Sequence, residues 1–288
     1  MYKKKEMVNN LIEALPYIEK FRNKIFVIKY GGSIIGNIAN KIAFVKDISL
    51  LTHLGMKIII VHGGGKHINK HLLEKGIESN FHKGYRITDS NTINEVEMVL
   101  SGHINKDITL LLNNLGTKAV GINGKDAGLI KSKKKIIDSE VDIGHVGEIV
   151  NINTEFLNLL LEKNYIPVIS PIGFDKEGNT YNINADDVAS EIANSMKAEK
   201  LFLISDINGI YTDLNNESTF ISRLNINESK KLILDGLVNG GMIPKINSCI
   251  NSIENGVKSV HIINGKITHS ILLEVFTDQG IGTMIEEW

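Results

Sequence analysis

Three glycine clusters stand next to short apolar runs and could bind an anion. Gly31-Gly32 follows the apolar run Lys24–Lys29, and Gly63–Gly65 closely follows the run Lys57–Val61. A third pair, Gly240-Gly241, precedes a segment with helical periodicity. Glycine lets backbone N–H groups approach a ligand, and a helix N-terminus adds the positive end of its dipole. Each cluster alone could be a tight turn, but the three together favour an anion such as phosphate.

Two lysines and one aspartate add the charges that phosphate chemistry requires. Lys29 ends the first apolar run beside a glycine cluster, and Lys245 lies at the predicted start of a helix after another cluster. Asp186 lies in the segment NINADD, just before a predicted helix. One carboxylate between two lysines would hold both ammonium groups and keep them charged. Lys29 could instead be a strand-end lysine that reaches solvent. His62 could be a general base, although a histidine where a strand meets a turn is more often structural.

Several common motifs do not occur in the sequence. The segment GGGKHI has neither the spacing of a P-loop nor the G-x-G-x-x-G pattern of a dinucleotide site, and no G-x-S-x-G elbow is found. The histidines and the one cysteine do not form a zinc-type Cys/His pattern, so we expect no metal held by the protein. Because Cys249 is alone, no internal disulfide can form, which favours a reducing compartment.

The composition is that of an ordinary globular protein. The 288 residues are 42% hydrophobic and 23% charged, which excludes general disorder. The 32 basic and 33 acidic residues give a net charge of -1, without the basic excess of a nucleic-acid-binding protein. No apolar run is long enough for a membrane helix, and the N-terminus does not resemble a signal or transit peptide. Arg22, Arg86 and Arg223 are the only arginines, so each is either retained by chance or needed for its planar guanidinium.

Hydrophobic periodicity predicts the elements that must position these residues. The predicted strands are 24–29, 57–61, 118–122, 166–170, 200–205, 259–263 and 282–285, and the predicted helices are 39–54, 66–75, 90–115, 154–163, 185–196 and 244–255. Residues 129–152 and the turn at 176–179 predict hairpins, and Ser90 is the expected cap of its helix. This alternation predicts an α/β fold, with an open, mainly parallel sheet sandwiched by helices. The polar hairpin region and the loop at 171–181 are the expected seams between two lobes.

Seven motifs in this order resemble the amino acid kinase family. They are KYGGS (29–33), VHGGGK (61–66), GYRITD (84–89), GHVGEI (144–149), NINADDVASEIA (182–193), LISDINGIY (203–211) and GGMIPKI (240–246). GYRITD and GHVGEI resemble the acetylglutamate kinases within that family. The resemblance implies the amino acid kinase fold, with an N-terminal helix at 1–22 and a kinase domain at 23–288. That domain would comprise an acetylglutamate lobe at about 23–180 and an ATP lobe at about 181–288.

The resemblance also implies a reaction, in which ATP phosphorylates the γ-carboxylate of N-acetyl-L-glutamate on the pathway of arginine biosynthesis. Mg²⁺ would arrive with the nucleotide. The implied roles are charge stabilisation for Lys29 and Lys245, orientation of both lysines for Asp186, phosphate binding for Gly32 and Gly64, and acetylglutamate binding for Gly64, Gly65, Arg86 and Asn182. Residues 203–211 and 240–245 would lie against ATP. Such a reaction needs positioning and fixed positive charge more than covalent work by the protein.

Both ends of the chain resemble the arginine-sensitive subgroup of these kinases. In that subgroup an N-terminal helix, here around Val8–Phe21, links dimers into a homohexamer, and L-arginine binds nearby as an inhibitor. The helix could instead simply cover the domain. Glu274 is our candidate partner for the cationic group of arginine, because a buried cation needs a carboxylate beside it. The alternative interpretation is that Glu274 is a surface charge on the last helix. Some relatives also bind a PII protein, which no residue here establishes.

Two other functions stay open at the level of sequence. One is a different amino acid kinase, such as a glutamate-5- or carbamate kinase. The other is a non-catalytic subunit that senses arginine or PII, although the intact set of Lys29, Asp186 and Lys245 speaks against it. The expected location is a bacterial cytoplasm, or the plastid stroma if the protein is encoded by an organelle.

Overall fold

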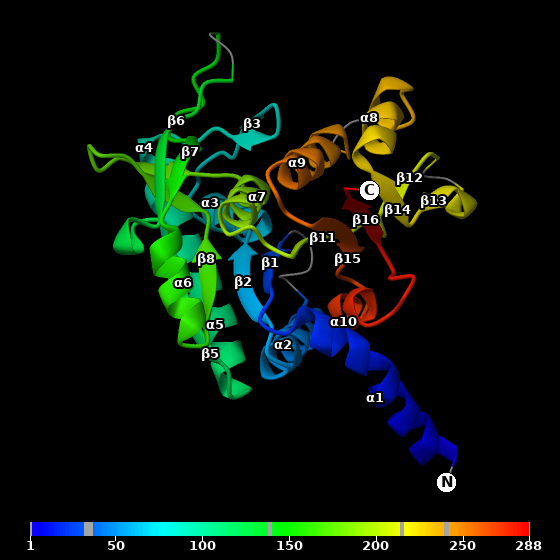
Figure 1. Ribbon diagram of the computed structural model, residues 1–288. Helices are drawn as coiled ribbons and strands as arrows, with labels where there is room; N and C mark the ends of the chain where they lie inside the picture. The colour runs from blue at the N-terminus through cyan, green and yellow to red at the C-terminus, as the bar shows by residue number, and fades with distance from the viewer. Residues whose placement is uncertain (1, 32–36, 138–139, 214–215, 239–241, 288) are drawn as a thin grey trace.

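An eight-stranded sheet forms the centre of the computed structural model, which describes residues 2–31, 37–137, 140–213, 216–238 and 242–287 (Figure 1). Its strands, in spatial order, are β14 (Arg223–Asn225), β16 (Thr283–Glu286), β15 (Ser259–Asn264), β11 (Lys200–Ser205), β1 (Ile25–Tyr30), β2 (Lys57–His62), β8 (Tyr165–Ser170) and β5 (Lys118–Asn123). From β15 to β5 all neighbours are parallel, whereas β16 runs antiparallel to β15. The predicted mainly parallel sheet is confirmed.

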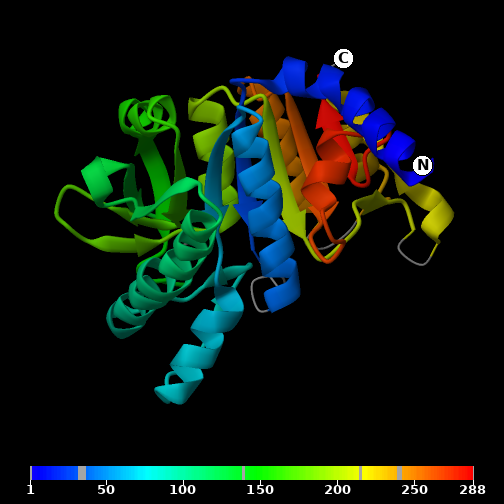
Figure 2. The ribbon, with the colours of Figure 1, turned by 90° about the horizontal axis from the view of Figure 1, so that it is seen from below.

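Helices cover both faces of the sheet, as Figures 1 and 2 show. The α-helices are α1 (Tyr2–Phe21), α2 (Ile38–His53), α3 (Gly65–Glu74), α4 (Ser90–Glu97), α5 (Asn105–Asn114), α6 (Thr154–Glu162), α7 (Ala185–Ser195), α8 (Ile226–Leu234), α9 (Met242–Glu254) and α10 (Ser270–Val275). One hydrophobic core joins the sheet to α6, α7 and α9, and the other joins it to α2, α5 and α10. The α/β sandwich expected from the sequence is therefore present.

Alternation along β1 sends neighbouring side chains into different cores. Phe26, Ile28 and Tyr30 belong to the core beneath α2, whereas Val27 belongs to the core beneath α7. Side chains two residues apart on a strand share a face, so Lys29 points toward α7. The strand thus directs its last lysine toward the helix that carries Asp186.

A four-stranded sheet contains the two predicted hairpins. Its order is β10 (Thr180–Asn182), β9 (Ile172–Phe174), β6 (Ile130–Lys134) and β7 (Gly147–Ile152). The pairs β6–β7 and β9–β10 are antiparallel, which confirms hairpins within 129–152 and around 176–179. Two further ribbons were not predicted: β3 (Phe81–His82) with β4 (Tyr85–Arg86), and β12 (Ile210–Tyr211) with β13 (Phe220–Ile221). Strands of two residues are too short to show a period of two in the sequence.

The helical segment predicted at 90–115 differs from the expectation in two respects. Its cap is Asp89, whose carboxylate accepts the N–H groups of Asn91 and Thr92 at 3.1 and 2.7 Å, so the prediction that Ser90 caps it was wrong. A π-helix, η2 (Met98–Ile104), also separates α4 from α5. Such a segment widens one turn of the helix and often accompanies a functional site.

The N-terminal helix α1 passes α10, and its N-terminal end points away from the body of the molecule (Figure 1). Its C-terminal end is anchored, because Phe21 is buried and packs edge-on against Phe26 with ring centroids 5.4 Å apart. Across the described ranges, the structure contains no helix that combines the length and the apolar character of a membrane span.

Candidate active site

Asp186 lies between Lys29 and Lys245 and contacts both ammonium groups. The Lys29 Nζ is 2.9 Å from Asp186 Oδ1, and the Lys245 Nζ is 3.4 Å from Oδ2. Burial on its own raises the pKa of Asp186, but the two lysine charges outweigh it and hold that pKa below its usual range. The carboxylate is therefore ionised at neutral pH, and it lies between the side-chain nitrogens of the two lysines.

Local structure brings these three groups to that point. Asp186 stands in the first turn of α7, where the Asn184 side chain caps the helix by accepting the Asp186 N–H at 2.8 Å. Lys245 lies in the first turn of α9, which packs against α7. A hydroxyl pair, Ser190 and Ser248 at 2.9 Å, joins the two helices. The two helix starts and the end of β1 therefore meet on one face of the sheet.

The glycines at the strand ends make close approaches that a side chain would prevent. A methyl group on Gly31 would lie 2.8 Å from Lys29 Cε, so Gly31 leaves the path of the lysine open. Gly63 donates its N–H to the Tyr30 carbonyl at 2.8 Å, which ties the two strand ends together. Gly64 caps α3, and a methyl group there would lie 2.5 Å from Ile104 Cδ1. The predicted phosphate ligand Gly32, like Gly240-Gly241, lies outside the described residues.

A cavity of about 220 Å³ opens beside Lys29. All four residues predicted to bind acetylglutamate, Gly64, Gly65, Arg86 and Asn182, line it. Its lining includes Lys29, Gly63, Gly64, Gly65, Ile68, Phe81, Gly84, Tyr85, Arg86, Leu100, Val146, Pro171, Asn182, Ile183, Asn184 and Ala185. The lining combines one lysine, one arginine and amide side chains with apolar walls. Such a mixture suits a small anion that also carries apolar atoms.

Arg86 supplies a buried positive charge to this cavity. Its side chain is 6% exposed, and burial lowers the pKa of the guanidinium to about 10. The group donates to the Ser79 hydroxyl and to the Gly65 carbonyl, and it lies 4.7 Å from the centre of the Phe81 ring. No carboxylate in the described part of the chain forms an ion pair with it. A buried guanidinium without an anionic partner favours a carboxylate on the ligand.

Asn182 reaches the same cavity from β10 and is held by two neighbouring segments. Its side-chain amide donates to the Thr88 hydroxyl at 3.3 Å, and its backbone N–H donates to the His145 carbonyl at 2.9 Å. Thr88 and His145 come from the motifs GYRITD and GHVGEI. Both motifs therefore hold Asn182, which lines the cavity, in place. In the sequence, these motifs had served only to indicate the family.

His62 is structural, as the sequence made more probable. It is fully buried, and burial lowers its pKa to about 4, so the ring is neutral at pH 7. Its Nε2 lies 3.2 Å from the side-chain amide of Asn105, and Nδ1 lies 3.1 Å from the Gly63 carbonyl. Within the described ranges no cluster of His, Cys, Asp or Glu has the arrangement of a metal site. The expectation that the histidines show no zinc-type spacing was wrong, because His67 and His71 stand one turn apart on α3 with H-x-x-x-H spacing. His71, however, contacts Glu95.

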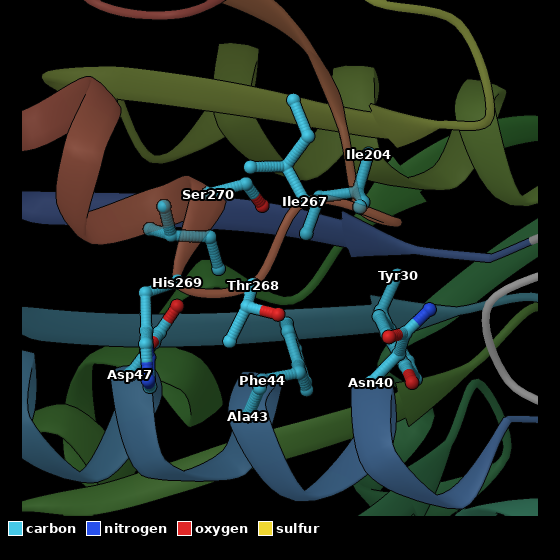
Figure 3. A pocket seen from close by; sticks show the side chains of 12 residues that line it. Tyr30, Asn40, Ala43, Phe44, Asp47, Ile204, Ile267, Thr268, His269 and Ser270 are labelled. Atoms are coloured by element: carbon cyan, nitrogen blue, oxygen red, sulfur yellow. The ribbon is translucent and has the colours of Figure 1, made fainter.

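A second, much smaller cavity lies on the opposite face of β1, between α2 and the segment before α10 (Figure 3). Tyr30 stacks on Phe44 there with ring centroids 3.9 Å apart, and the His269 ring lies 2.5 Å from the Asp47 carboxylate. Burial, partly offset by His269, raises the pKa of Asp47 to about 6. The cavity measures about 10 Å³, close to the space of one water, so it cannot hold a substrate.

Comparison with known proteins establishes the family of this chain. The sequence pattern of the amino acid kinase family matches residues 24–264, which is most of the chain. The chain belongs to the amino acid kinase family. Acetylglutamate kinase from Thermoanaerobacter pseudethanolicus is 52% identical over 275 residues, covering 96% of this chain and 91% of that protein. Acetylglutamate kinase from Campylobacter hominis is 53% identical over 287 residues, covering 100% and 99%.

One solved structure extends the comparison beyond the kinases. N-acetylglutamate synthase from Neisseria gonorrhoeae, complexed with coenzyme A and N-acetyl-glutamate, matches with a TM-score of 0.87 and 25% identity. The match covers 98% of this amino acid kinase chain, which spans 63% of the synthase chain. The kinase fold thus recurs there as part of a longer protein.

Four residues of this amino acid kinase site were missed by the sequence analysis. Asn184 caps α7, and Asp187 follows Asp186 on the same first turn. Tyr85 lines the cavity, and Lys135, just after β6, contacts both Tyr85 and Asp187. Asn184 was recognisable from its position before a helix. Lys135 carried no local signal, because its partners lie about 50 residues away on either side.

Proposed function

We propose that this protein transfers the γ-phosphoryl group of ATP to the γ-carboxylate of N-acetyl-L-glutamate, giving N-acetyl-L-glutamyl 5-phosphate in arginine biosynthesis. The observation that carries the proposal is the Lys29–Asp186–Lys245 group at the edge of a cavity that contains the guanidinium of Arg86. The cavity supplies positive charge for a carboxylate acceptor, and the lysine pair supplies it for a phosphoryl group. Relatives about half identical over nearly their whole length carry the name of this enzyme.

In the proposed mechanism the acceptor lies in the cavity, with one of its carboxylates on Arg86 and Asn182. The γ-carboxylate is already ionised, so its oxygen can attack the γ-phosphorus without a general base, and the bond from that phosphorus to the β–γ bridging oxygen breaks to release ADP. Negative charge develops on the transferring group, where Lys29 and Lys245 stabilise it. Asp186 keeps both lysines in place. The glycine N–H groups at residues 32 and 64 bind phosphate oxygens.

We further propose that ATP binds on the side of Lys245, against residues 203–211 and 240–245, and brings Mg²⁺ with it. The sheet supports a division into two lobes. Strands β1, β2, β8 and β5 come from the first 170 residues, and β11, β15, β16 and β14 come from residue 200 onward. An acetylglutamate lobe at about 23–180 and an ATP lobe at about 181–288 would then meet at the β1–β11 pair. Because the relatives named above are bacterial, we place the reaction in a bacterial cytoplasm rather than in a plastid.

Release of ADP in the presence of different acceptors tests the function directly. We expect turnover with N-acetyl-L-glutamate and little or none with L-glutamate or carbamate, which separates this enzyme from a glutamate-5- or carbamate kinase. A coupled assay with ATP and Mg²⁺ measures it. Absence of turnover with every acceptor would instead support the non-catalytic sensing subunit.

An exposed apolar stripe on α1 supports a regulatory assembly of the arginine-sensitive type. Val8, Leu11, Ile12 and Leu15 form an apolar stripe along the helix, with exposed fractions of 50% to 62%. Their spacing of three and four residues puts them on one face. We propose that this stripe packs against α1 of a second copy and so joins dimers into a hexamer, because a helix that only covered its own domain would bury these residues.

The effector would bind where α1 meets α10. A cavity of about 630 Å³ lies there, and its lining includes Tyr17, Phe21, Lys200, His261, Glu274 and Asp278. Glu274 is buried, so the alternative that it is a surface charge is wrong. Its carboxylate contacts His261 Nδ1 at 2.7 Å and accepts the N–H groups of Ile281 and Gly282 at 2.7 and 3.0 Å. We propose that arginine fills this cavity, with its cationic group directed to Glu274.

Deletion of Met1–Phe21 should reduce the assembly from about six chains to about two and weaken inhibition by arginine, because both the stripe and one wall of the cavity are lost. The double substitution of Leu11→Glu and Ile12→Glu is the matched variant, since it disrupts the stripe but leaves Tyr17 and Phe21 in place. We expect it to reduce the size while arginine still binds. Light scattering and an arginine titration measure the two effects. Unchanged size and inhibition after the deletion would contradict both proposals.

A further inference from the structure

Lys135 makes a cluster with two residues from distant parts of the chain. Its Nζ donates to the Tyr85 hydroxyl at 2.8 Å and lies 3.2 Å from Asp187 Oδ2. The same ammonium lies 4.3 Å from the centre of the Tyr85 ring, and the Tyr85 hydroxyl is 3.4 Å from Asp187 Oδ2. The Lys135 side chain is 21% exposed. We call Tyr85, Lys135 and Asp187 the Lys135 cluster.

Each member of the cluster adjoins a residue of the proposed active site. Tyr85 lines the acceptor cavity and precedes Arg86 on β4, the second strand of the β3–β4 ribbon. Asp187 follows Asp186 in the first turn of α7. The Lys135 backbone N–H donates to the carbonyl of Val146, another lining residue, at 2.8 Å. Lys135 therefore connects the β3–β4 ribbon, the β6–β7 hairpin and α7.

The cluster also places a positive charge beside the carboxylate of Asp187. Asp186 and Asp187 are adjacent carboxylates, and the ion pairs of Asp186 are with Lys29 and Lys245. Lys135 is the cation that pairs with Asp187. Burial on its own lowers the pKa of Lys135, but the bonds with Tyr85 and Asp187 outweigh it and raise that pKa above its usual value. The ammonium therefore stays charged at the pH of catalysis.

The β3–β4 ribbon forms a separate two-stranded sheet, outside the eight-stranded and four-stranded sheets. Its strands have two residues each, pair only with one another, and leave Phe81 55% exposed. An isolated two-stranded ribbon is marginal in water, so side-chain contacts to the rest of the domain decide where it lies. For Tyr85, those contacts are to Lys135 and Asp187.

We propose that Lys135 is a positioning residue, which fastens the β3–β4 ribbon to α7 and so holds Arg86 over the acceptor cavity. The inference rests on the proposed function, because it takes that cavity to be the acetylglutamate site. Lys135 does not touch the acceptor. When Lys135 holds the ribbon in place, little of the binding free energy of the acceptor is needed to order it. Loss of Lys135 therefore weakens acceptor binding, whereas phosphoryl transfer in the filled site stays largely intact.

The test is steady-state kinetics of Lys135→Met, which removes the charge and keeps an apolar side chain. We expect KM for N-acetylglutamate to rise about tenfold, as for loss of a charged hydrogen bond, with KM for ATP unchanged and kcat within about twofold. Lys135→Arg should recover most of the loss. Lys133→Met is the matched control two residues earlier, on β6, because Lys133 pairs with the exposed Glu148 at 3.3 Å, and it should behave as wild type.

Two further measurements keep the inference separate from general stability and from the proposed function. Asp187→Asn should reproduce Lys135→Met, and the double variant should be little worse than either, because the cluster acts as one unit. Amide hydrogen exchange of residues 81–87 in the substrate-free protein should be faster in Lys135→Met, whichever acceptor the enzyme uses. Unchanged KM together with unchanged exchange in the ribbon would overturn the inference, whereas a wild-type enzyme inactive on N-acetylglutamate would overturn only the function.

Discussion

Lys245→Ala and Lys29→Ala should each lower kcat for phosphorylation of N-acetylglutamate by at least about 100-fold, the order of losing one preorganised electrostatic donor. Each ammonium lies within 3.4 Å of the shared Asp186 carboxylate, so its charge is already in place before the reaction starts. That charge matters most while the phosphoryl group is between donor and acceptor. KM for the acceptor should change less than kcat. Initial rates at saturating ATP and N-acetylglutamate measure the effect.

Lys230→Ala is the control for the lysine variants. Lys230 on α8 pairs with Glu254 at the end of α9 at 2.8 Å, but both side chains are about half exposed and lie outside the site. An exposed pair of this kind contributes little, so kcat should stay close to wild type. If either site variant kept more than half of the wild-type kcat, its lysine would have no role in phosphoryl transfer.

Arg86→Lys should raise KM for N-acetylglutamate by about tenfold or more while KM for ATP changes little, because it keeps the charge and loses the planar fork. The guanidinium reaches Ser79, the Gly65 carbonyl and the Phe81 ring at once, and an ammonium cannot keep all three contacts. Titration of each substrate at saturating levels of the other separates the two effects. Equal rises in both KM values would mean that Arg86 supports the fold rather than the acceptor.

The exposed Arg223 provides the comparison for that experiment. It pairs with Glu286 near the C-terminus, and its side chain is 56% exposed. Arg223→Lys retains a charge where solvent can replace lost hydrogen bonds, so both KM values should stay near wild type. The two variants together test whether the scarcity of arginine in this sequence points to function at residue 86.

The parts of the site that the sequence predicted are those with local signals. Lys29 stands where an apolar run meets a glycine cluster, and Asp186 stands where a polar segment meets a helix. Both junctions can be recognised from a few neighbouring residues. The regular alternation of strands and helices predicted the sheet for the same reason. Helix α8, which was not predicted, also has a local signal in the sequence, since Asn225 and Glu228 form a capping box at its start.

The parts that the sequence did not predict depend on contacts between distant segments. Lys135 lies in a run of similar lysines, and only the fold shows that it alone meets Tyr85 and Asp187. The same holds for Glu274, which the pattern of the last helix could not distinguish from a surface charge until His261 was found beside it. Pairings of this kind are set by topology, which no window of neighbouring residues contains.

The π-helix η2 amounts to one extra residue inserted into an otherwise continuous α-helix. Leu100 and Ile104, both within it, are the side chains closest to the position that a methyl group on Gly64 would take. Deletion of one residue from 98–104 should restore a regular helix, and Leu100, which lines the cavity, would then change its position relative to Gly64. A change of length by a single residue would therefore alter the wall of the cavity beside Lys29, where Leu100 lies, while the strands of the sheet keep their register.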